Sequence, residues 1–247
     1  MANNGRFYIE DSLQYGAKIV ISESVIRHFF ALRIKQGESV TLFNGDGCNY
    51  SCLVLRVSKK EVELEVQSVS LNNTVLPSVI HLMMAMIQKD NFELVIQKAV
   101  EMGVTYITPI NTDFSQRIDQ DRLKDRVSRW QQIAISASEQ SGRSLVPVIN
   151  YPLHISQIID SIATVSKDST VINILGDLDS PNNITNVDFT CYKTINLFVG
   201  PEGGFSDKEL KSFDCIDGIC RVSLGAGILR AETAAIVAIG VIMLKVY

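Results

Sequence analysis

The segment from Leu197 to Ser206 constrains the fold most strongly, because an apolar run leads directly into a turn that contains three glycines. The run Leu197–Val199 is typical of a buried strand, and glycines let the backbone that follows approach a ligand closely. Ser206 can cap a following helix, with Glu209 closing a capping box. This order of strand, turn and helix indicates an α/β fold. The turn itself can bind a ligand, or it can be a tight connection without a ligand, and the local sequence leaves both open.

A second glycine-rich turn, Leu224–Gly227, lies between a short predicted strand and an apolar helix. Ligands of parallel α/β sheets bind at the carboxyl ends of the strands, so the two turns can line one pocket. The dinucleotide-binding pattern is not matched, because its third glycine position holds Arg230, and neither turn is followed by the lysine of a P-loop. The pattern therefore favours a nucleoside held by backbone groups over a triphosphate.

Strands and helices alternate from residue 73 onward, which predicts a mostly parallel sheet covered by helices. The expected strands are 80–87, 105–110, 171–175 and 195–199, and the expected helices are 92–102 (ending at Gly103), 122–138, 208–213 and 231–244. Residues 1–72 differ, because short β-branched runs at 18–21, 39–43, 50–57 and 61–66 surround a turn at 44–47 and one helix at 23–32. We therefore predict a small β-barrel (1–72) followed by an α/β domain (73–247).

Composition limits the classes of function. With 46% hydrophobic and 20% charged residues the chain can build a core, and its net charge of -4 excludes binding of nucleic acid through global positive charge. Five cysteines, an odd number without the spacing of a zinc or redox motif, indicate reduced thiols and a cytoplasmic protein. The first residues do not resemble a signal peptide. The apolar stretch 234–244 is shorter than the roughly 20 residues of a membrane span and predicts a buried helix.

Taken together, the motifs resemble the ribosomal RNA small subunit methyltransferase E family. The likeness is carried by the two turn segments, 199–206 and 224–234, and by 97–104, 130–134, 139–143, 6–8, 28–33 and 42–45, in the right order along nearly the whole chain. The resemblance implies a SPOUT-type methyltransferase domain with a C-terminal trefoil knot, a PUA-like barrel before it, and a homodimer. It also implies S-adenosylmethionine as methyl donor, no metal, and methylation of uridine N3 in 16S ribosomal RNA, in the decoding region of the small ribosomal subunit.

The resemblance also assigns the adenosyl pocket. Its expected lining is Leu175, Gly176, Val199, Gly200, Gly204, Leu224, Gly225 and Leu229. Leu175 and Leu229 have an alternative as plain core residues. Gly227 departs from the family pattern, which usually has a basic residue there for a phosphate or RNA contact.

Three charged residues are candidates for catalysis. Methylation at N3 removes the proton of uracil N3, and negative charge spreads to the neighbouring carbonyl oxygens. Arg230, a permanent cation with several donors, is the candidate to stabilise that charge, with a structural pairing to Glu232 as the alternative. Glu139 and Glu232 are both candidates to accept the proton or to orient Arg230, and the sequence does not choose between them.

RNA contacts are expected from local patches. In the barrel the candidates are Arg6, Arg27, His28 and Arg33. Gln140 and Arg143 are expected to face RNA or the partner subunit, and Trp130 is expected in the core or a dimer contact. Three alternatives stay open: a SPOUT enzyme acting on another RNA, a non-catalytic RNA-binding module, and a nucleotide-binding enzyme of another chemistry, for which phosphate-binding residues are not found.

Overall fold

The computed structural model describes residues 5–22, 25–58, 60–165, 168–216 and 218–247. The chain divides into two compact units. The N-terminal unit comprises residues 1–75 together with 138–146, and the C-terminal unit comprises 76–137 together with 147–247. The segment 138–146 joins the N-terminal unit, although in the sequence it lies within the predicted second domain (73–247).

The N-terminal unit is a five-stranded sheet with one helix, as the β-branched runs predicted. Its elements are β1 (Arg6–Tyr8), β2 (Lys18–Ser22), α1 (Ile26–Ala31), β3 (Ser39–Phe43), β4 (Cys48–Val57) and β5 (Glu61–Leu71), and the strand order is β1-β3-β4-β5-β2. The predicted turn at 44–47 joins β3 to β4. Helix α1 is shorter than the predicted helix at 23–32, of which residues 23 and 24 lie outside the described residues.

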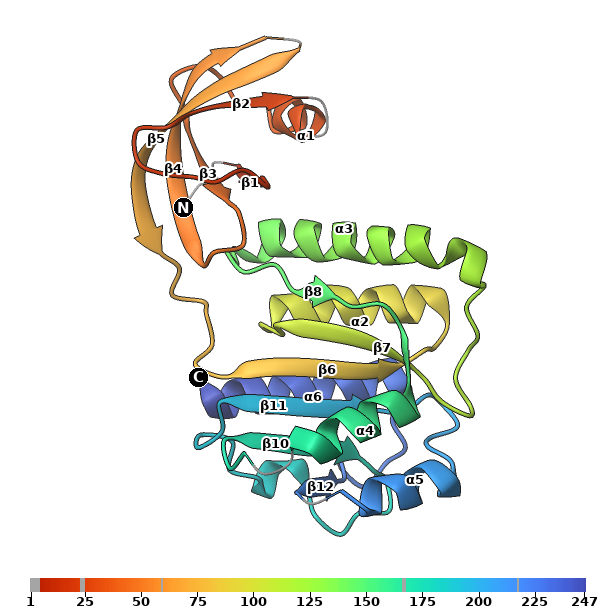
Figure 1. Ribbon diagram of the computed structural model, residues 1–247. Helices are drawn as coiled ribbons and strands as arrows, with labels where there is room; N and C mark the ends of the chain where they lie inside the picture. Colours follow the sequence, from red (N-terminus) through yellow and green to blue (C-terminus); the bar gives the residue numbers. More distant parts are fainter. Residues whose placement is uncertain (1–4, 23–24, 59, 166–167, 217) are drawn as a thin grey trace. The chain divides into compact units, whose positions relative to one another are not determined.

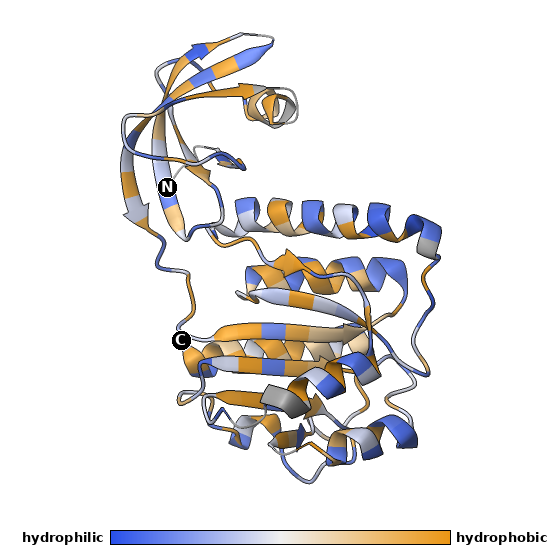
Figure 2. Ribbon diagram, in the orientation of Figure 1, coloured by the Kyte–Doolittle hydropathy of each residue, from blue (hydrophilic) through white to orange (hydrophobic). Residues whose placement is uncertain are grey.

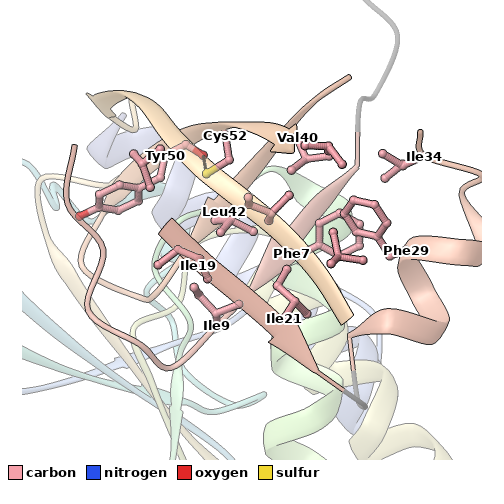
Figure 3. Packing of buried hydrophobic residues seen from close by; sticks show 14 of the residues in the cluster. Phe7, Ile9, Ile19, Ile21, Phe29, Ile34, Val40, Leu42, Tyr50 and Cys52 are labelled. Carbon is pink, nitrogen blue, oxygen red and sulfur yellow. Dashed lines mark hydrogen bonds between the residues drawn. The ribbon is translucent and has the colours of Figure 1, made fainter. Parts of the chain in front are cut away.

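One apolar core holds this sheet together (Figure 3). All five strands and α1 contribute side chains to it, and Phe7 of β1 stacks on Phe29 of α1 with ring centroids 5.1 Å apart. The alternation predicted for 61–66 is confirmed, because Val62, Leu64 and Val66 are buried while the residues between them are partly or fully exposed. Side chains from every strand therefore meet in one core, as expected for a small barrel.

Hydrogen bonds explain why segment 138–146 belongs to this unit. The buried Asn72 side chain donates from Nδ2 to the Gly142 carbonyl (2.8 Å) and to Ser144 Oγ (2.7 Å). Arg143 Nη1 donates to the Thr74 carbonyl (2.7 Å). These bonds join residues about 70 positions apart, so no local pattern reveals them.

The C-terminal unit contains a parallel sheet with helices on both faces (Figure 1). Its strands are β6 (Val79–Ala85), β7 (Tyr106–Asn111), β8 (Val148–Ile149), β9 (Leu153–His154), β10 (Val171–Gly176), β11 (Thr194–Val199) and β12 (Ile219–Val222). Its helices are α2 (Lys89–Glu101), α3 (Leu123–Ser141, whose last residues belong to the N-terminal unit), α4 (Ile155–Val165), α5 (Asp207–Asp214), α6 (Ala231–Val246) and the short η1 (Gln120–Arg122) and η2 (Ile184–Asn186). The strand order is β12-β10-β11-β6-β7-β8, with β9 also paired to β7, and these pairings are parallel.

The sheet is buried on both faces, which explains its continuous apolar strands. Leu82 and its neighbour Met83 point to opposite faces, and both are buried. One face packs against α4 and α5, and α2 and α6 contact each other on the other face (Figure 1). The central strands β6, β10 and β11 are mainly hydrophobic in Figure 2, as expected for a covered parallel sheet.

The predicted strands and helices of this unit are confirmed to within a few residues. Helix α2 ends as expected, because Gly103 adopts φ +89° and donates its N–H to the Val100 carbonyl. Trp130 is a core residue, 2% exposed, with its ring 4.9 Å from that of Phe92. Helix α6 contains the apolar stretch 234–244 and buries much of it, and among the described residues none of the helices has the length and apolar character needed to cross a bilayer.

Helix α4 and the short strands β8 and β9 were not predicted. The helix is rich in isoleucine, which is β-branched and therefore a weaker helix former than leucine. Ile155, Ile158 and Ile162 nevertheless have helical spacing and pack into the core beside α5. The spacing of these isoleucines is thus a signal in the sequence itself from which the helix could have been predicted.

Candidate functional site

The carboxyl ends of three adjacent strands, β12, β10 and β11, surround a cavity of about 400 Å³. Segments that follow these strands, together with α5 and α6, form its walls. The lining residues are Gly176–Asp179, Leu197, Val199–Phe205, Leu210, Val222, Leu224, Gly227–Leu229, Ala231, Ala234 and Ala238. Both glycine-rich turns contribute, which confirms the prediction that they line one pocket.

The close packing of the first turn favours glycine at three positions that line the cavity. A Cβ atom on Gly200 would lie 3.2 Å from the ring of Phe205 and 3.3 Å from the carbonyl carbon of Gly204. A Cβ on Gly203 would lie 3.2 Å from Cβ of Phe114. Gly204 has φ +71°, a left-handed conformation that favours glycine, and donates its N–H to the Pro201 carbonyl. The shape of the turn therefore favours glycine at these positions, and three glycines without side chains line this part of the cavity.

A buried carboxylate fixes the end of this turn. The predicted capping box is present: Ser206 N–H donates to Glu209 Oε2 (2.8 Å), and Glu209 N–H donates to Ser206 Oγ (3.3 Å). Glu209 Oε1 also accepts the N–H of Asp113 (2.9 Å), and Ser206 Oγ donates to Asp113 Oδ2 (2.5 Å). The side chain of Glu209 is only 5% exposed. No local pattern reveals this link to the loop after β7, because it joins residues 96 positions apart.

The remaining walls combine apolar and acidic groups. Val199, Val222 and Ala234 give the cavity an apolar side, and Asp177 and Asp179 border it beside the end of β10. In the described part of the chain, no hydrogen bond to protein is donated by the N–H groups of residues 224–229. An apolar surface for a base, free peptide donors and carboxylates for hydroxyl or cationic groups suit a nucleoside that carries positive charge.

Six of the eight residues expected at the adenosyl pocket line this cavity: Gly176, Val199, Gly200, Gly204, Leu224 and Leu229. Leu175 is instead fully buried in the core beside α4 and α5, which is the alternative left open for it. Gly225 is exposed in the second turn, with φ +128°, and is not part of the lining. Ligand contacts at all eight positions stay predictions.

Two of the three catalytic candidates lie together at the start of α6. Arg230 is the exposed N-cap residue, and among the described residues its side chain has no ion pair, so the proposed pairing with Glu232 is not seen. Glu232 is 7% exposed, and its Oε2 has no hydrogen-bond partner. Glu139 lies in the N-terminal unit, where its Oε1 accepts the N–H of Tyr8 (3.0 Å). A buried carboxylate oxygen without a partner costs free energy, which makes Glu232 unusual.

The six candidates for RNA contact have different surroundings. Arg6 donates from Nη2 to Ser144 Oγ (2.6 Å), and burial lowers the pKa of its guanidinium to about 10 although Glu139 opposes this shift. Burial also lowers the pKa of Arg143, which donates a hydrogen bond to the Thr74 carbonyl. Arg33 and Gln140 are exposed. Arg27 and His28 lie in α1, but their side chains are outside the described part of the structure. Arg6 and Arg143 thus already have partners within the N-terminal unit.

Metal ligands are not grouped anywhere in the described residues, where no cluster of three His, Cys, Asp or Glu side chains could hold an ion.

Comparison with known proteins places these features in a family. The model of an RNA methyltransferase domain matches residues 74–243, and that of an RNA methyltransferase PUA domain matches residues 15–67. Ribosomal RNA small subunit methyltransferase E of Mesomycoplasma hyopneumoniae is 29% identical over 232 residues, with 94% of this chain and 95% of the relative covered. The enzyme of the same name from Aquifex aeolicus is 27% identical, with 96% and 98% covered.

Two solved structures agree with this. A ribosomal RNA small subunit methyltransferase E from Neisseria gonorrhoeae, bound to S-adenosylmethionine, has a TM-score of 0.86 and 30% identity, with 96% of this chain and 95% of that chain covered. A methyltransferase from Legionella pneumophila, also in complex with S-adenosylmethionine, has a TM-score of 0.86 and 32% identity, with 97% and 96% covered. The cavity, the two matching domains and these relatives together show that the chain belongs to the ribosomal RNA small subunit methyltransferase E family.

Proposed function

We propose that this protein transfers the methyl group of S-adenosylmethionine to N3 of a uridine in 16S ribosomal RNA, in the decoding region of the small ribosomal subunit. The observation that carries the proposal is the cavity at the ends of β10, β11 and β12, lined by both glycine-rich turns. Two relatives with the same fold are bound to S-adenosylmethionine. Residues 73–247 form the proposed methyltransferase domain, and residues 1–72 the proposed RNA-binding domain.

The residues around the cavity fit this donor. Gly200 and Gly203 could not carry a Cβ atom without crowding their neighbours, and the lack of side chains there lets the donor come close to the backbone. Asp179 suits its hydroxyl groups or its positive charge, whereas both carboxylate oxygens of Asp177 already accept hydrogen bonds, from Arg221 and from the Asp179 N–H. When bound, S-adenosylmethionine supplies a methyl group that is already activated by the positively charged sulfur, so the chain's own task is mainly to position the base and to remove a proton.

We further propose that the C-terminal segment forms a trefoil knot. After β12 the chain runs beside the segment that follows β10: Ser223 N–H donates to the Asn182 carbonyl, and Ile184 N–H donates to the Ser223 carbonyl. At the far end of α6, Lys245 Nζ donates to the carbonyls of Thr185 and Val187. These contacts join the last helix and the segment before it to the loop that follows β10 (182–187), and in the proposed knot the chain passes through this loop.

Arg230 and Glu232 are the proposed catalytic residues. Arg230 has an exposed guanidinium at the start of α6, where it can stabilise the negative charge that develops on the uracil carbonyl oxygens. Glu232 has an unpartnered, buried Oε2 that can accept the N3 proton or a hydrogen bond from Arg230. Glu139, already bonded to Tyr8, stays as the alternative base.

The proposed partners are 16S ribosomal RNA or the assembled subunit and a second copy of the chain. RNA would contact Arg33 and Gln140, which are exposed, and Arg27 and His28 of α1. A homodimer is supported by Leu244 and Val237 of the apolar helix α6, which are 75% and 38% exposed. We propose a cytoplasmic location, in line with a ribosomal substrate and free cysteines.

Calorimetric titration with S-adenosylmethionine tests the donor site. The structure favours Ala234→Phe as the blocking variant over a substitution of Gly204, because Gly204 needs its left-handed conformation while Ala234 is a helical position on the cavity wall. Thr233→Phe is the matched control, since Thr233 is exposed on the same helix and outside the lining. We expect wild type and control to bind, and Ala234→Phe to bind much more weakly.

Methyl transfer is then assayed with labelled donor on 16S ribosomal RNA and on small subunits, and the product nucleoside is identified by mass spectrometry. Incorporation as N3-methyluridine supports the full proposal. Incorporation only into another RNA would move the target, and RNA binding without donor binding would identify a non-catalytic module.

A further inference from the structure

Arg221 of β12 lies at the junction of three walls of the cavity. Its guanidinium contacts Asp177 Oδ2 from Nη1 (3.1 Å), and contacts Asp214 Oδ1 (2.5 Å) and the Leu210 carbonyl (3.0 Å) from Nη2. The Arg221 side chain is 27% exposed and that of Asp177 is 13% exposed, so this ion pair is largely shielded from water.

The elements that Arg221 joins all contribute residues to the cavity lining. Asp177 and Leu210 both line the cavity, and so does Val222, which follows Arg221 in β12. The main chain strengthens the same junction: Ser180 Oγ donates to the Arg221 carbonyl (2.9 Å), and Asp177 N–H donates to the Val222 carbonyl (2.9 Å). One side chain therefore connects the turn after β10, helix α5 and strand β12.

We propose that Arg221 is a positioning residue for the methyl-donor site, which holds the 177–180 turn and α5 in the arrangement that binds S-adenosylmethionine. This inference rests on the proposed function. Arg221 itself is not part of the cavity lining, so it acts through Asp177 and Leu210. The planar guanidinium serves three acceptors at once, which the single ammonium of lysine cannot match in geometry.

The physical effect is preorganisation. If the wall adopts its binding arrangement only a fraction of the time, the apparent Kd rises by the inverse of that fraction. Removing a hydrogen-bonded charge from a shielded pair leaves Asp177 without its partner, and this loss corresponds to a weakening of donor binding by about tenfold or more.

The test compares Arg221→Gln and Arg221→Lys with Arg129→Gln. Arg129 forms a bidentate pair with Glu93 (both contacts 2.7 Å) on α3 and α2, outside the cavity lining, so it controls for general loss of an ion pair. Affinity for S-adenosylmethionine is measured by calorimetry and stability by thermal melting. We expect about tenfold weaker binding for Arg221→Gln, partial recovery for Arg221→Lys, and wild-type affinity for Arg129→Gln.

Amide hydrogen exchange gives a readout that needs no ligand. In Arg221→Gln we expect faster exchange at Asp177 and Asp179, whose N–H groups are bonded within this junction, and unchanged exchange in β6. If wild type does not bind the donor, the proposed function fails, and hydrogen exchange still decides whether Arg221 orders the wall.

Wild-type affinity in a folded Arg221→Gln protein would overturn the inference, and so would equal weakening in Arg129→Gln. If Arg221→Gln does not fold, Asp214→Asn takes its place. Asp214 is 59% exposed and contributes one contact, so its loss should not unfold the protein. The expected result is about twofold to fivefold weaker binding, and an unchanged Kd would refute the proposal.

Discussion

Glu209 offers a sharp test of how the first glycine turn is held. Its two carboxylate oxygens accept different backbone N–H groups, that of Asp113 on Oε1 and that of Ser206 on Oε2. Because a carboxylate has acceptors on both sides, both donors are satisfied by one side chain. Glutamine has the same shape but carries an NH₂ group on one side, so one of the two N–H groups must face another donor.

The expected magnitudes follow from this count. Each backbone N–H that loses a charged acceptor in a partly buried position costs about 1–2 kcal/mol. Glu209→Gln should therefore lower the free energy of unfolding by about 1–2 kcal/mol, and Glu209→Ala, which removes both acceptors, by about 2–4 kcal/mol. Because both bonds anchor the end of the 200–206 turn, donor affinity should fall in the same order.

Urea denaturation and calorimetric titration with S-adenosylmethionine measure the two effects. Asp207→Asn is the matched control, because it removes the same charge from the same helix turn. The Asp207 side chain is exposed and accepts a hydrogen bond from neither the Asp113 nor the Ser206 N–H. It should lower stability by less than about 1 kcal/mol. Equal losses for Glu209→Gln and Asp207→Asn would refute the reasoning, because the effect would then come from helix charge alone.

Three further predictions concern pH, catalysis and thiol reactivity. Burial lowers the pKa of His81 from 6.5 to about 4, so the folded protein keeps this histidine neutral where the unfolded chain takes up a proton. The stabilisation from this group is therefore complete above about pH 6.5. As the pH falls from there towards 4, the free energy of unfolding drops by at most about 3 kcal/mol. Urea denaturation curves of wild type and His81→Gln should diverge in this window. Arg230→Ala should lower kcat of methyl transfer by about 100-fold with little change in the Kd for the donor, and a change confined to Kd would contradict its proposed role. Burial raises the pKa of Cys52 to about 11, so at pH 8 iodoacetamide should modify the exposed Cys191 and Cys215 and spare Cys52, which peptide mass spectrometry can check.

Local sequence determined much of this protein. Apolar runs predicted the strands of the parallel sheet, since a strand covered on both faces needs apolar residues at every position. Helical spacing of apolar residues and glycines at turns and helix ends predicted most of the helices that cover it. The turn at 200–204 and the capping box at Ser206 were readable because both are formed by residues a few positions apart. The family resemblance followed from the same segments.

Tertiary structure decided what lies between distant residues. Segment 138–146 joins the N-terminal unit through Asn72, and the acidic wall of the cavity is held by Arg221 from another strand. Glu209 reaches Asp113, and Glu232 is left with an unpartnered oxygen. A sequence pattern reports periodicity and local bonding, whereas these contacts depend on which strand ends the sheet order brings together.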